Sequence, residues 1–293
     1  MLKKPSIFIA CAFLAVAAWT SFPHFARADV EWKVVKDLDL KKTPLDIAPS
    51  LDGKWLYILT PGEVVIYSFV EGAITDRISV DKNFDRIVSL PRPDSLVVSS
   101  SKKKALQVVL LERTYKIDVA GSPFKGPEGA PVTIVVFDDY QCPYCAGLEP
   151  LLRQVSESFP KDVKLVIKHF PLAMHSYAKK AAAAAIAAGK QGKFWEMHEK
   201  LFANQKDLGD AKVEAIAAEL GLNMDQFDKD LKDPSVASFI DKDTNDGVRA
   251  GVQGTPTVFI NGKPFNQRSP EGFRQAIEAE LKKVHPQSSQ NSR

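Results

Sequence analysis

Two cysteines separated by two residues, Cys142 and Cys145, directly follow an apolar run at residues 132–137. The run predicts a buried strand, and residues 142–159 predict a helix that begins at the cysteine pair. A sulfur at a helix N-terminus lies near unpaired backbone N–H groups and the positive end of the helix dipole, which favour a thiolate over a thiol. A strand, a cysteine pair and a helix in this order strongly limit both the fold and the chemistry of the chain.

A Cys-x-x-Cys pair is typical of a structural disulfide, half of a zinc site, or a redox-active dithiol. A disulfide closing so short a loop stabilises a fold by only about 2 kcal/mol in the chain-entropy treatment. Zinc needs three or four ligands, and the sequence has no second cysteine pair and no histidines at finger-like spacing. The redox interpretation explains more. Cys142 is then the attacking sulfur and Cys145 the resolving one, and Pro143 suits the first helical turn because it lacks an N–H donor.

The N-terminus predicts a secretory signal peptide. Lys3 and Lys4 precede an apolar stretch at residues 7–19, and an Ala-Arg-Ala sequence ends at Ala28, the expected cleavage site. The stretch is shorter than the roughly 18 residues of a membrane span. Cys11 would leave with the signal, so only the Cys-x-x-Cys pair would reach the oxidising compartment. Removal of residues 1–28 takes three of the 39 basic residues and none of the 36 acidic ones, so no basic excess indicates nucleic-acid binding.

Residues 29–112 predict a small all-β domain, because short β-branched and aromatic runs alternate with Asp-Gly and Pro-Gly turns. Residues 46–60 align with residues 86–100 at an offset of about 40, a period that suits four-stranded propeller blades. The segment SLDGKWLYILTPGEVVIYSF also resembles a blade of the YVTN type of β-propeller. Two blades do not close a ring that typically needs four or more. Coincidental similarity between two meanders remains the alternative.

Residues 113–130 are expected to form a linker with an edge strand at 116–119, and residues 131–285 an α/β domain followed by a polar tail at 286–293. Within the α/β domain we expect these elements: strands 132–137 and 163–168 flanking the first helix, helical sequence at 176–250, strand 257–260, an Asn-Gly hairpin turn, and a final helix at 270–285. The alanine run at 181–185, together with Phe194, Trp195 and Met197, is interpreted as helix packing rather than a binding face.

Four segments resemble the thioredoxin-fold disulfide oxidoreductases of the DsbA type: APVTIVVFDDYQCPYC, KHFPL, GKFWEMHEKLFANQ and GVQGTPTVFINGKPF. The resemblance covers residues 115–285 and implies an α/β thioredoxin-like fold with a helical insertion, preceded here by the small all-β domain. It implies catalysis by Cys142 and Cys145, with Pro143 and Tyr144 as the active-site dipeptide and no cofactor. It also implies a periplasmic location.

The same resemblance implies a cis peptide bond before Pro256. This bond would place the backbone of Thr255 beside the cysteine pair, where it binds an extended substrate by strand addition. An ordinary strand start is the alternative interpretation. One position departs from the family pattern: many relatives carry a buried acid six residues before the first cysteine, and this chain has Val136 there. Asp138 and Asp139 come closer to the pair and are expected at exposed positions.

The leading hypothesis is an exported thiol–disulfide oxidoreductase that forms, reduces or isomerises disulfides in reduced or misoxidised exported proteins. The alternative is a non-catalytic polypeptide-binding module on a thioredoxin scaffold. The resemblance implies a membrane redox partner of the DsbB type for an oxidase or of the DsbD type for an isomerase. Residues 29–112 should either pack against the catalytic domain or form a homodimer, because uncovered sheet edges tend to be paired. We favour the homodimer.

Overall fold

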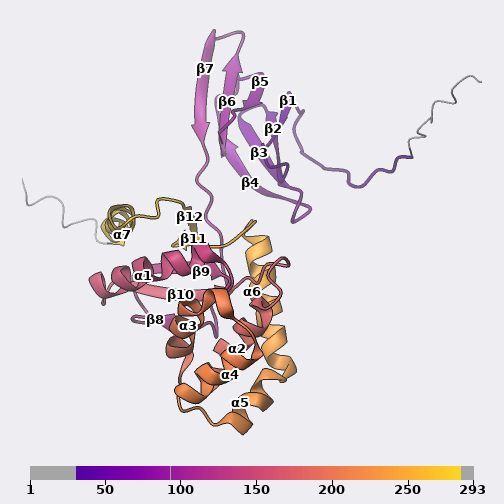
Figure 1. The fold of residues 1–293 in the computed structure, drawn as a ribbon. Helices are drawn as coiled ribbons and strands as arrows, with labels where there is room; N and C mark the ends of the chain where they lie inside the picture. The colour runs from indigo at the N-terminus through magenta and orange to yellow at the C-terminus, as the bar shows by residue number, and fades with distance from the viewer. Residues whose placement is uncertain (1–30, 93, 285–293) are drawn as a thin grey trace, which may run out of the picture. The chain divides into compact units, whose positions relative to one another are not determined.

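A computed structural model of the chain describes residues 31–92 and 94–284 (Figure 1). The predicted signal peptide with its cleavage site, and the polar tail, lie outside the described residues. Residues up to Lys41 form a unit of their own, which has no helix or strand in its described part. All helices and strands described below belong to the second unit, which begins at Lys42.

The first part of this unit consists of two antiparallel sheets. Strands β1 (Asp46–Pro49), β2 (Trp55–Thr60), β3 (Glu63–Ser68) and β4 (Ala73–Ser79) form one sheet in sequential order. Strands β5 (Arg86–Ser89), β6 (Ser95–Ser100) and β7 (Ala105–Leu110) form the other. The strands β5 and β6 begin 40 residues after β1 and β2, in agreement with the predicted offset. The described residues hold no further sheet that would close a propeller ring.

The two sheets pack face to face around one hydrophobic core. Tyr57, Leu59 and Ile66 contribute from the first sheet, and Leu96 and Val98 from the second. Each of these side chains alternates along its strand with one that points the opposite way, which is the two-residue period of a β-strand.

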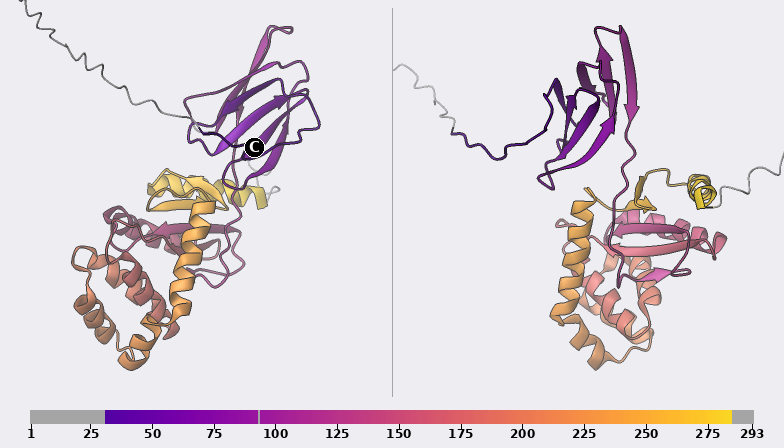
Figure 2. Two further views of the ribbon diagram at one scale, coloured as in Figure 1. Left: turned by 90° about the vertical axis from the view of Figure 1, so that its right-hand side faces the viewer. Right: turned by 180° about the vertical axis from the view of Figure 1, so that it is seen from behind.

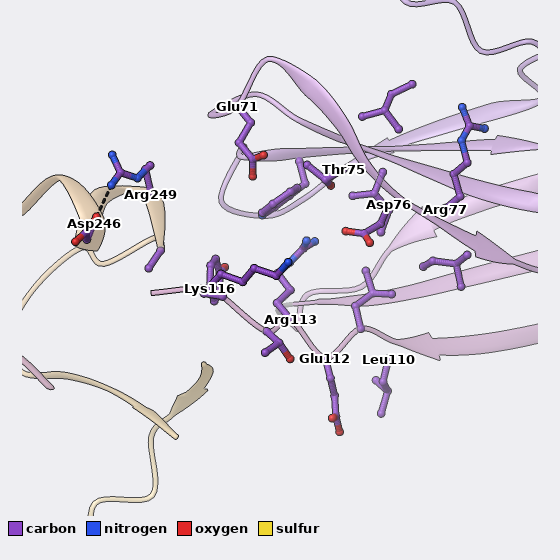
Figure 3. A pocket seen from close by; sticks show the side chains of 18 of the residues that line it. Glu71, Thr75, Asp76, Arg77, Leu110, Glu112, Arg113, Lys116, Asp246 and Arg249 are labelled. Atoms are coloured by element: carbon purple, nitrogen blue, oxygen red, sulfur yellow. Dashed lines mark hydrogen bonds and ion pairs between the residues drawn. The ribbon is translucent and has the colours of Figure 1, made fainter. Parts of the chain in front are cut away.

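Arg113 lies at the margin of this core (Figure 3). Its guanidinium lies 3.7 Å from the centre of the Trp55 ring, donates to Asp94 and donates to the Tyr57 hydroxyl at 2.9 Å. An arginine that stacks on one aromatic ring and bonds another fixes the chain where it leaves the second sheet.

The second part is an α/β domain around a five-stranded sheet in the order β12-β11-β9-β10-β8. Its strands are β8 (Phe124–Lys125), β9 (Val132–Asp138), β10 (Val163–His169), β11 (Thr257–Ile260) and β12 (Lys263–Phe265). The central strands β9 and β10 are parallel and connected through helix α1 (Pro143–Ser158), while the remaining pairs are antiparallel. This is the predicted thioredoxin-like fold, preceded by small antiparallel sheets.

The predicted helical insertion lies between β10 and β11. It comprises α2 (Ala178–Lys190), α3 (Phe194–Ala203), the 3-10 turn η1 (Gln205–Asp207), α4 (Asp210–Glu219), α5 (Met224–Leu231) and α6 (Pro234–Arg249), and the final helix α7 (Pro270–Val284) follows β12. Helices α2 to α5 gather at the end of the domain remote from α7 (Figure 2). Phe194, Met197 and most alanines of α2 are buried in one core, as predicted, and Trp195 is partly buried against it.

Residues 116–119 differ from the prediction, because they form no strand and the edge strand is β8 instead. Ile117 and Val119 pack against a core that contains Phe137 and Phe259, on one face of the sheet. The alternation of apolar and polar residues at 116–119 therefore arises because Ile117 and Val119 pack on the face of the sheet, and not because the segment pairs with an edge strand. The same alternation is produced by both situations, so the pattern did not separate them.

A buried cluster of charges attaches helix α6 to strand β10. The fully buried Lys168 ammonium lies 2.5 Å from the Asp243 carboxylate and 2.7 Å from that of Asp246. Asp243 also accepts the backbone N–H of His169 at 2.9 Å, and Asp246 pairs with Arg249 (Figure 3). Two carboxylates on successive turns of α6 thus attach this helix to β10. Strand β10 pairs with β9, the strand that precedes the cysteine pair.

Candidate active site

Both cysteines lie at the N-terminus of helix α1. Cys142 is the N-cap residue and Pro143 the first helical residue, as the sequence predicts. The backbone N–H of Cys145 donates to the Cys142 carbonyl at 3.1 Å, so Cys145 lies within the first turn. Both side chains are free thiols and both are buried. No acidic residue occupies the first turn of α1 to oppose a negative charge on the Cys142 sulfur.

The loop before β11 brings a backbone carbonyl to the first cysteine. The Cys142 thiol donates to the carbonyl oxygen of Thr255 at a distance of 3.3 Å, although the two residues are 113 positions apart. The Thr255–Pro256 peptide bond is cis. The Thr257 hydroxyl donates to the Gly254 carbonyl at 2.7 Å, and Arg268 donates to the Pro256 carbonyl at 2.5 Å. These bonds hold the loop from both sides.

Tyr144 differs from the other residues of the site in its exposure. Its side chain is 74% exposed, whereas the two cysteines on either side of Pro143-Tyr144 are 3% exposed. A large aromatic side chain at this exposure is available for contact with another molecule.

Asp138 corrects an expectation from the sequence, because it is buried rather than exposed. It is the last residue of β9, two positions after Val136, so the two side chains point to the same face of the sheet. Val136 packs in the core that also contains Cys142 and Cys145. The acid absent at the usual position is thus present on the same face, two residues closer to the cysteines.

The electrostatics of Asp138 connect it to the resolving thiol. Burial raises the pKa of Asp138 well above its usual value, and the charges of Glu149 and Asp139 raise it further. Its Oδ1 atom has no hydrogen-bond partner in the described part of the chain. Burial also raises the pKa of the Cys145 thiol well above its usual range, and the negative charge of Asp138 is the next largest cause. A buried acid and a buried thiol therefore share one low-dielectric environment.

Asp139 is buried as well, which is a second correction, but it is fully bonded. Its carboxylate accepts the backbone N–H of Gln141 at 2.7 Å and that of Leu172 at 2.8 Å. The same oxygen that accepts from Leu172 lies 2.8 Å from His175 Nδ1. This carboxylate fastens the loop after β10 to the segment just before Cys142.

Behind the cysteines runs a buried chain of polar groups that the sequence interpretation did not identify. The Tyr140 hydroxyl lies 2.9 Å from Nδ1 of His198, whose Nε2 lies 3.1 Å from the Glu149 carboxylate. Tyr140 and His198 are buried, and the Glu149 side chain is 11% exposed. Glu149 lies one turn after Cys145 on α1, so the chain connects the cysteine helix to α3.

A second histidine, His169, stands beside this chain and takes no part in it. Its ring centre lies 6.0 Å from that of Tyr140, and both ring nitrogens are buried without a partner among the described residues. Burial lowers the pKa of His169 to about 3, so the ring is neutral at physiological pH. The sequence signal for His198 was its place in the GKFWEMHEKLF segment, but spacing alone did not pair it with Tyr140 or Glu149.

A free cysteine pair at a helix N-terminus, facing a backbone carbonyl next to a cis-proline on a thioredoxin-like sheet, defines a DsbA-like thiol–disulfide oxidoreductase domain. The chain belongs to the thioredoxin family. The family model Thioredoxin_4, described as thioredoxin, matches residues 118–279, which is more than half of the chain.

Solved structures agree with this assignment. BdbD from Bacillus subtilis in its oxidised form is 27% identical with a TM-score of 0.53, covering 58% of this chain and 98% of that one. A thioredoxin-like oxidoreductase from Silicibacter pomeroyi is 27% identical with a TM-score of 0.50, covering 56% and 94%. The thiol-disulfide exchange protein α-DsbA2 from Wolbachia pipientis, at 22% identity and a TM-score of 0.51 over 55% and 87%, shows the fold alone.

Curated relatives include much longer proteins. The Na(+)/H(+) antiporter NhaA 1 of Salinispora arenicola is 39% identical over 155 residues, which are 53% of this chain and 24% of the antiporter. The antiporter NhaA of Herminiimonas arsenicoxydans is 34% identical over 139 residues, 47% of this chain and 22% of that protein. The chain thus spans about a quarter of the length of these relatives. Among residues 31–92 and 94–284, no helix combines the length and apolarity needed to cross a bilayer.

Proposed function

We propose that this protein is an exported thiol–disulfide oxidoreductase that acts on the cysteines of other exported proteins. The observation that carries the proposal is the position of the Cys142 sulfur, at the start of α1 and 3.3 Å from the Thr255 carbonyl. An extended substrate that pairs with the backbone at Thr255 would bring its own sulfur next to Cys142. The proposed location is the periplasm, reached through the signal peptide at residues 1–28.

The reaction is a pair of thiol–disulfide exchanges. In the oxidising direction a substrate thiolate attacks Cys142 of the Cys142–Cys145 disulfide, the sulfur–sulfur bond breaks, and Cys145 leaves as a thiolate that takes up a proton. A second substrate thiolate then attacks the substrate sulfur of the mixed disulfide and releases Cys142. The substrate loses two electrons and two protons, and the protein gains them as two thiols. A membrane oxidase of the DsbB type then removes these two electrons and restores the disulfide, whereas in an isomerase a DsbD-type reductase would keep the pair as thiols.

Asp138 is proposed as the group that exchanges this proton with Cys145. Burial raises the pKa of both groups, and the charge of Asp138 raises that of Cys145 further, so the proton is retained near the pair until a charge forms there. The unbonded Oδ1 of Asp138 leaves one oxygen available for the proton. Tyr140, His198 and Glu149 form a hydrogen-bonded chain next to the site.

The test is turnover on a reduced, unfolded protein with known disulfides, followed in a glutathione buffer. Formation of native disulfides by the wild-type protein, its loss in Cys142→Ala, and accumulation of mixed disulfides in Cys145→Ser would support the proposal. A protein that binds unfolded polypeptide but transfers no disulfide in either direction would instead be the non-catalytic binding module. Comparison of reduced with misoxidised substrates separates an oxidase from an isomerase.

A further inference from the structure

The sheet formed by β5, β6 and β7 has an apolar outer face. It points away from the core between the two sheets, and we call it the β7 face after the strand that supplies most of it. Its apolar residues are Val88, Val97, Leu106, Val108 and Leu110. Val88, Leu106, Val108 and Leu110 are 59%, 68%, 56% and 58% exposed, which is unusual for neighbouring aliphatic side chains on a regular sheet.

The internal repeat explains why this face is apolar. At the 40-residue offset Val88 corresponds to Ala48 and Val97 to Tyr57, and the cross-strand partner of Val97 is Val108 just as that of Tyr57 is Ile66. In the first sheet the corresponding residues are buried against the second sheet. The β7 face is therefore the equivalent of a face that, one repeat earlier, is covered by another sheet. Its composition is that of an interface.

The edge of this sheet is equally unprotected. Strand β7 pairs with β6 on one side, and no described strand pairs with it on the other, although the first sheet has β4 in the equivalent place. Natural edges are usually blocked by lysine, proline or a bulge, and β7 (ALQVVL) contains no charge and no proline. Arg86, at the start of the opposite edge strand β5, is the one charged side chain in the described strands of this sheet.

The occupant that these observations favour is a second copy of the same face. A head-to-tail arrangement would require the outer face of the first sheet. Ile58 and Val65 in the middle of that face are 3% and 0% exposed and so are already covered, and only Ile47 on the edge strand β1 is open among these three, at 57%. The one charge on the β7 face is Arg86, which aligns with Ser99 and Leu106 but stands at the start of the edge strand β5, at the margin where interfaces are polar. Its exposed side chains amount to roughly 450 Å² a copy, and two copies supply about the apolar half of a standard interface near 1,600 Å².

We propose that two copies of the protein associate through the β7 face, sheet against sheet, about a two-fold axis. In such an isologous contact the same residues serve both copies, and stacked sheets interdigitate their side chains at about 10 Å. The particle carries two Cys142–Cys145 pairs. The association goes beyond the proposed redox function and does not depend on it, because no residue of the β7 face belongs to the cysteine site.

The test is light scattering and sedimentation of the mature wild-type chain between about 1 and 100 μM, beside Val108→Glu and the control Val248→Glu. Val248 lies on α6 and is 53% exposed, close to the 56% of Val108, so both glutamates replace an equally exposed valine. We expect a wild-type dimer, an unchanged dimer for V248E, and a dissociation constant at least a hundredfold higher for V108E. Circular dichroism of V108E should match the wild type, since the side chain is exposed in one copy.

Three results would overturn the inference: a wild-type monomer at 100 μM, a V108E dimer of wild-type affinity, or equal weakening by V248E. A dimer that persists in V108E would point to pairing along the β7 edge rather than across the face. If V108E changed the circular dichroism, Leu106→Lys on the same face would repeat the test. Thiol–disulfide turnover of the V108E monomer tests the redox function separately from the dimer. Normal oxidase turnover by this monomer would support the proposed redox function whatever the oligomeric state.

Discussion

Replacement of Asp138 by asparagine should make the reduced protein more stable at neutral pH, although it removes a group proposed to act in catalysis. The carboxyl is buried and its pKa is raised, first by burial and then by Glu149 and Asp139. The folded state therefore keeps a proton that the unfolded state releases near pH 4. A rise in pH pulls the proton from the unfolded chain only, so it favours unfolding.

The size of the effect follows from proton linkage. Between the unfolded pKa and the raised folded pKa, the two states differ by one bound proton, and the free energy of unfolding falls by about 1.4 kcal/mol for each pH unit. The amide of the D138N variant has no such proton to lose. The difference between D138N and wild type should thus grow from near zero at pH 4 with that slope, up to a limit of about 4 kcal/mol at pH 7.

The assay is chemical denaturation of the reduced proteins at several pH values from 4 to 8, in an excess of a phosphine reductant. Helical circular dichroism is the suitable signal, because every helix in the described residues belongs to the α/β domain. Asp139→Asn is the matched control, since Asp139 is a neighbour of equal burial whose carboxylate accepts hydrogen bonds. D139N should lower the stability by roughly 1–3 kcal/mol at pH 7.

A difference between D138N and wild type that does not change with pH would refute the reasoning, because it would mean that the folded state ionises Asp138 as easily as the unfolded state does. The same variant should slow protonation-coupled release of Cys145 and so lower the turnover number. If D138N were stabilised and still showed full turnover, the raised pKa of Asp138 would be supported, but Asp138 would have no role in the reaction.

Three other predictions concern reactivity, packing and domain independence. Cys142 should be alkylated by iodoacetamide faster than Cys145 in the reduced protein at pH 7, because burial and Asp138 raise the pKa of Cys145; faster labelling of Cys145, seen by peptide mapping, would reverse the assigned roles. Lys168→Met should cost about 3–5 kcal/mol in denaturation, because it leaves two carboxylates without their buried cation; a loss below about 1 kcal/mol would contradict this. Deletion of residues 29–112 should leave dithiol oxidation measurable, because the cores of the α/β domain contain no residue of that segment. The same deletion should reduce any isomerase activity, and turnover of the two proteins on reduced and on misoxidised substrates would show both effects.

The local order of the α/β domain could be predicted from the sequence. Strand 132–137, the helix after Cys142 and strand 257–260 each carry an apolar period, a Pro or Gly boundary, or both, and such signals act over a few residues. The 40-residue repeat likewise predicted where β5 and β6 begin, because equal spacing of turns and apolar runs is a property of the chain itself.

Burial near the cysteines could not be predicted in the same way. Asp138 and Asp139 are neighbours of the same type, and both were expected in solvent. Whether either is covered depends on segments from other parts of the chain, such as the loop at Leu172, whose backbone N–H donates to Asp139. The Asp139 carboxylate accepts hydrogen bonds, whereas Oδ1 of Asp138 has no partner among the described residues. This difference depends on tertiary packing.

Short-range patterns along the chain dictate which strands and helices form and that a dithiol stands at the start of one helix. Only the packing of distant elements brings Thr255 to Cys142 across 113 positions, joins Tyr140 to Glu149 through His198, and leaves the β7 face open. Contacts of this kind depend on how elements stack, and the apolar alternation of a strand is the same whether its face is covered by the chain or left exposed.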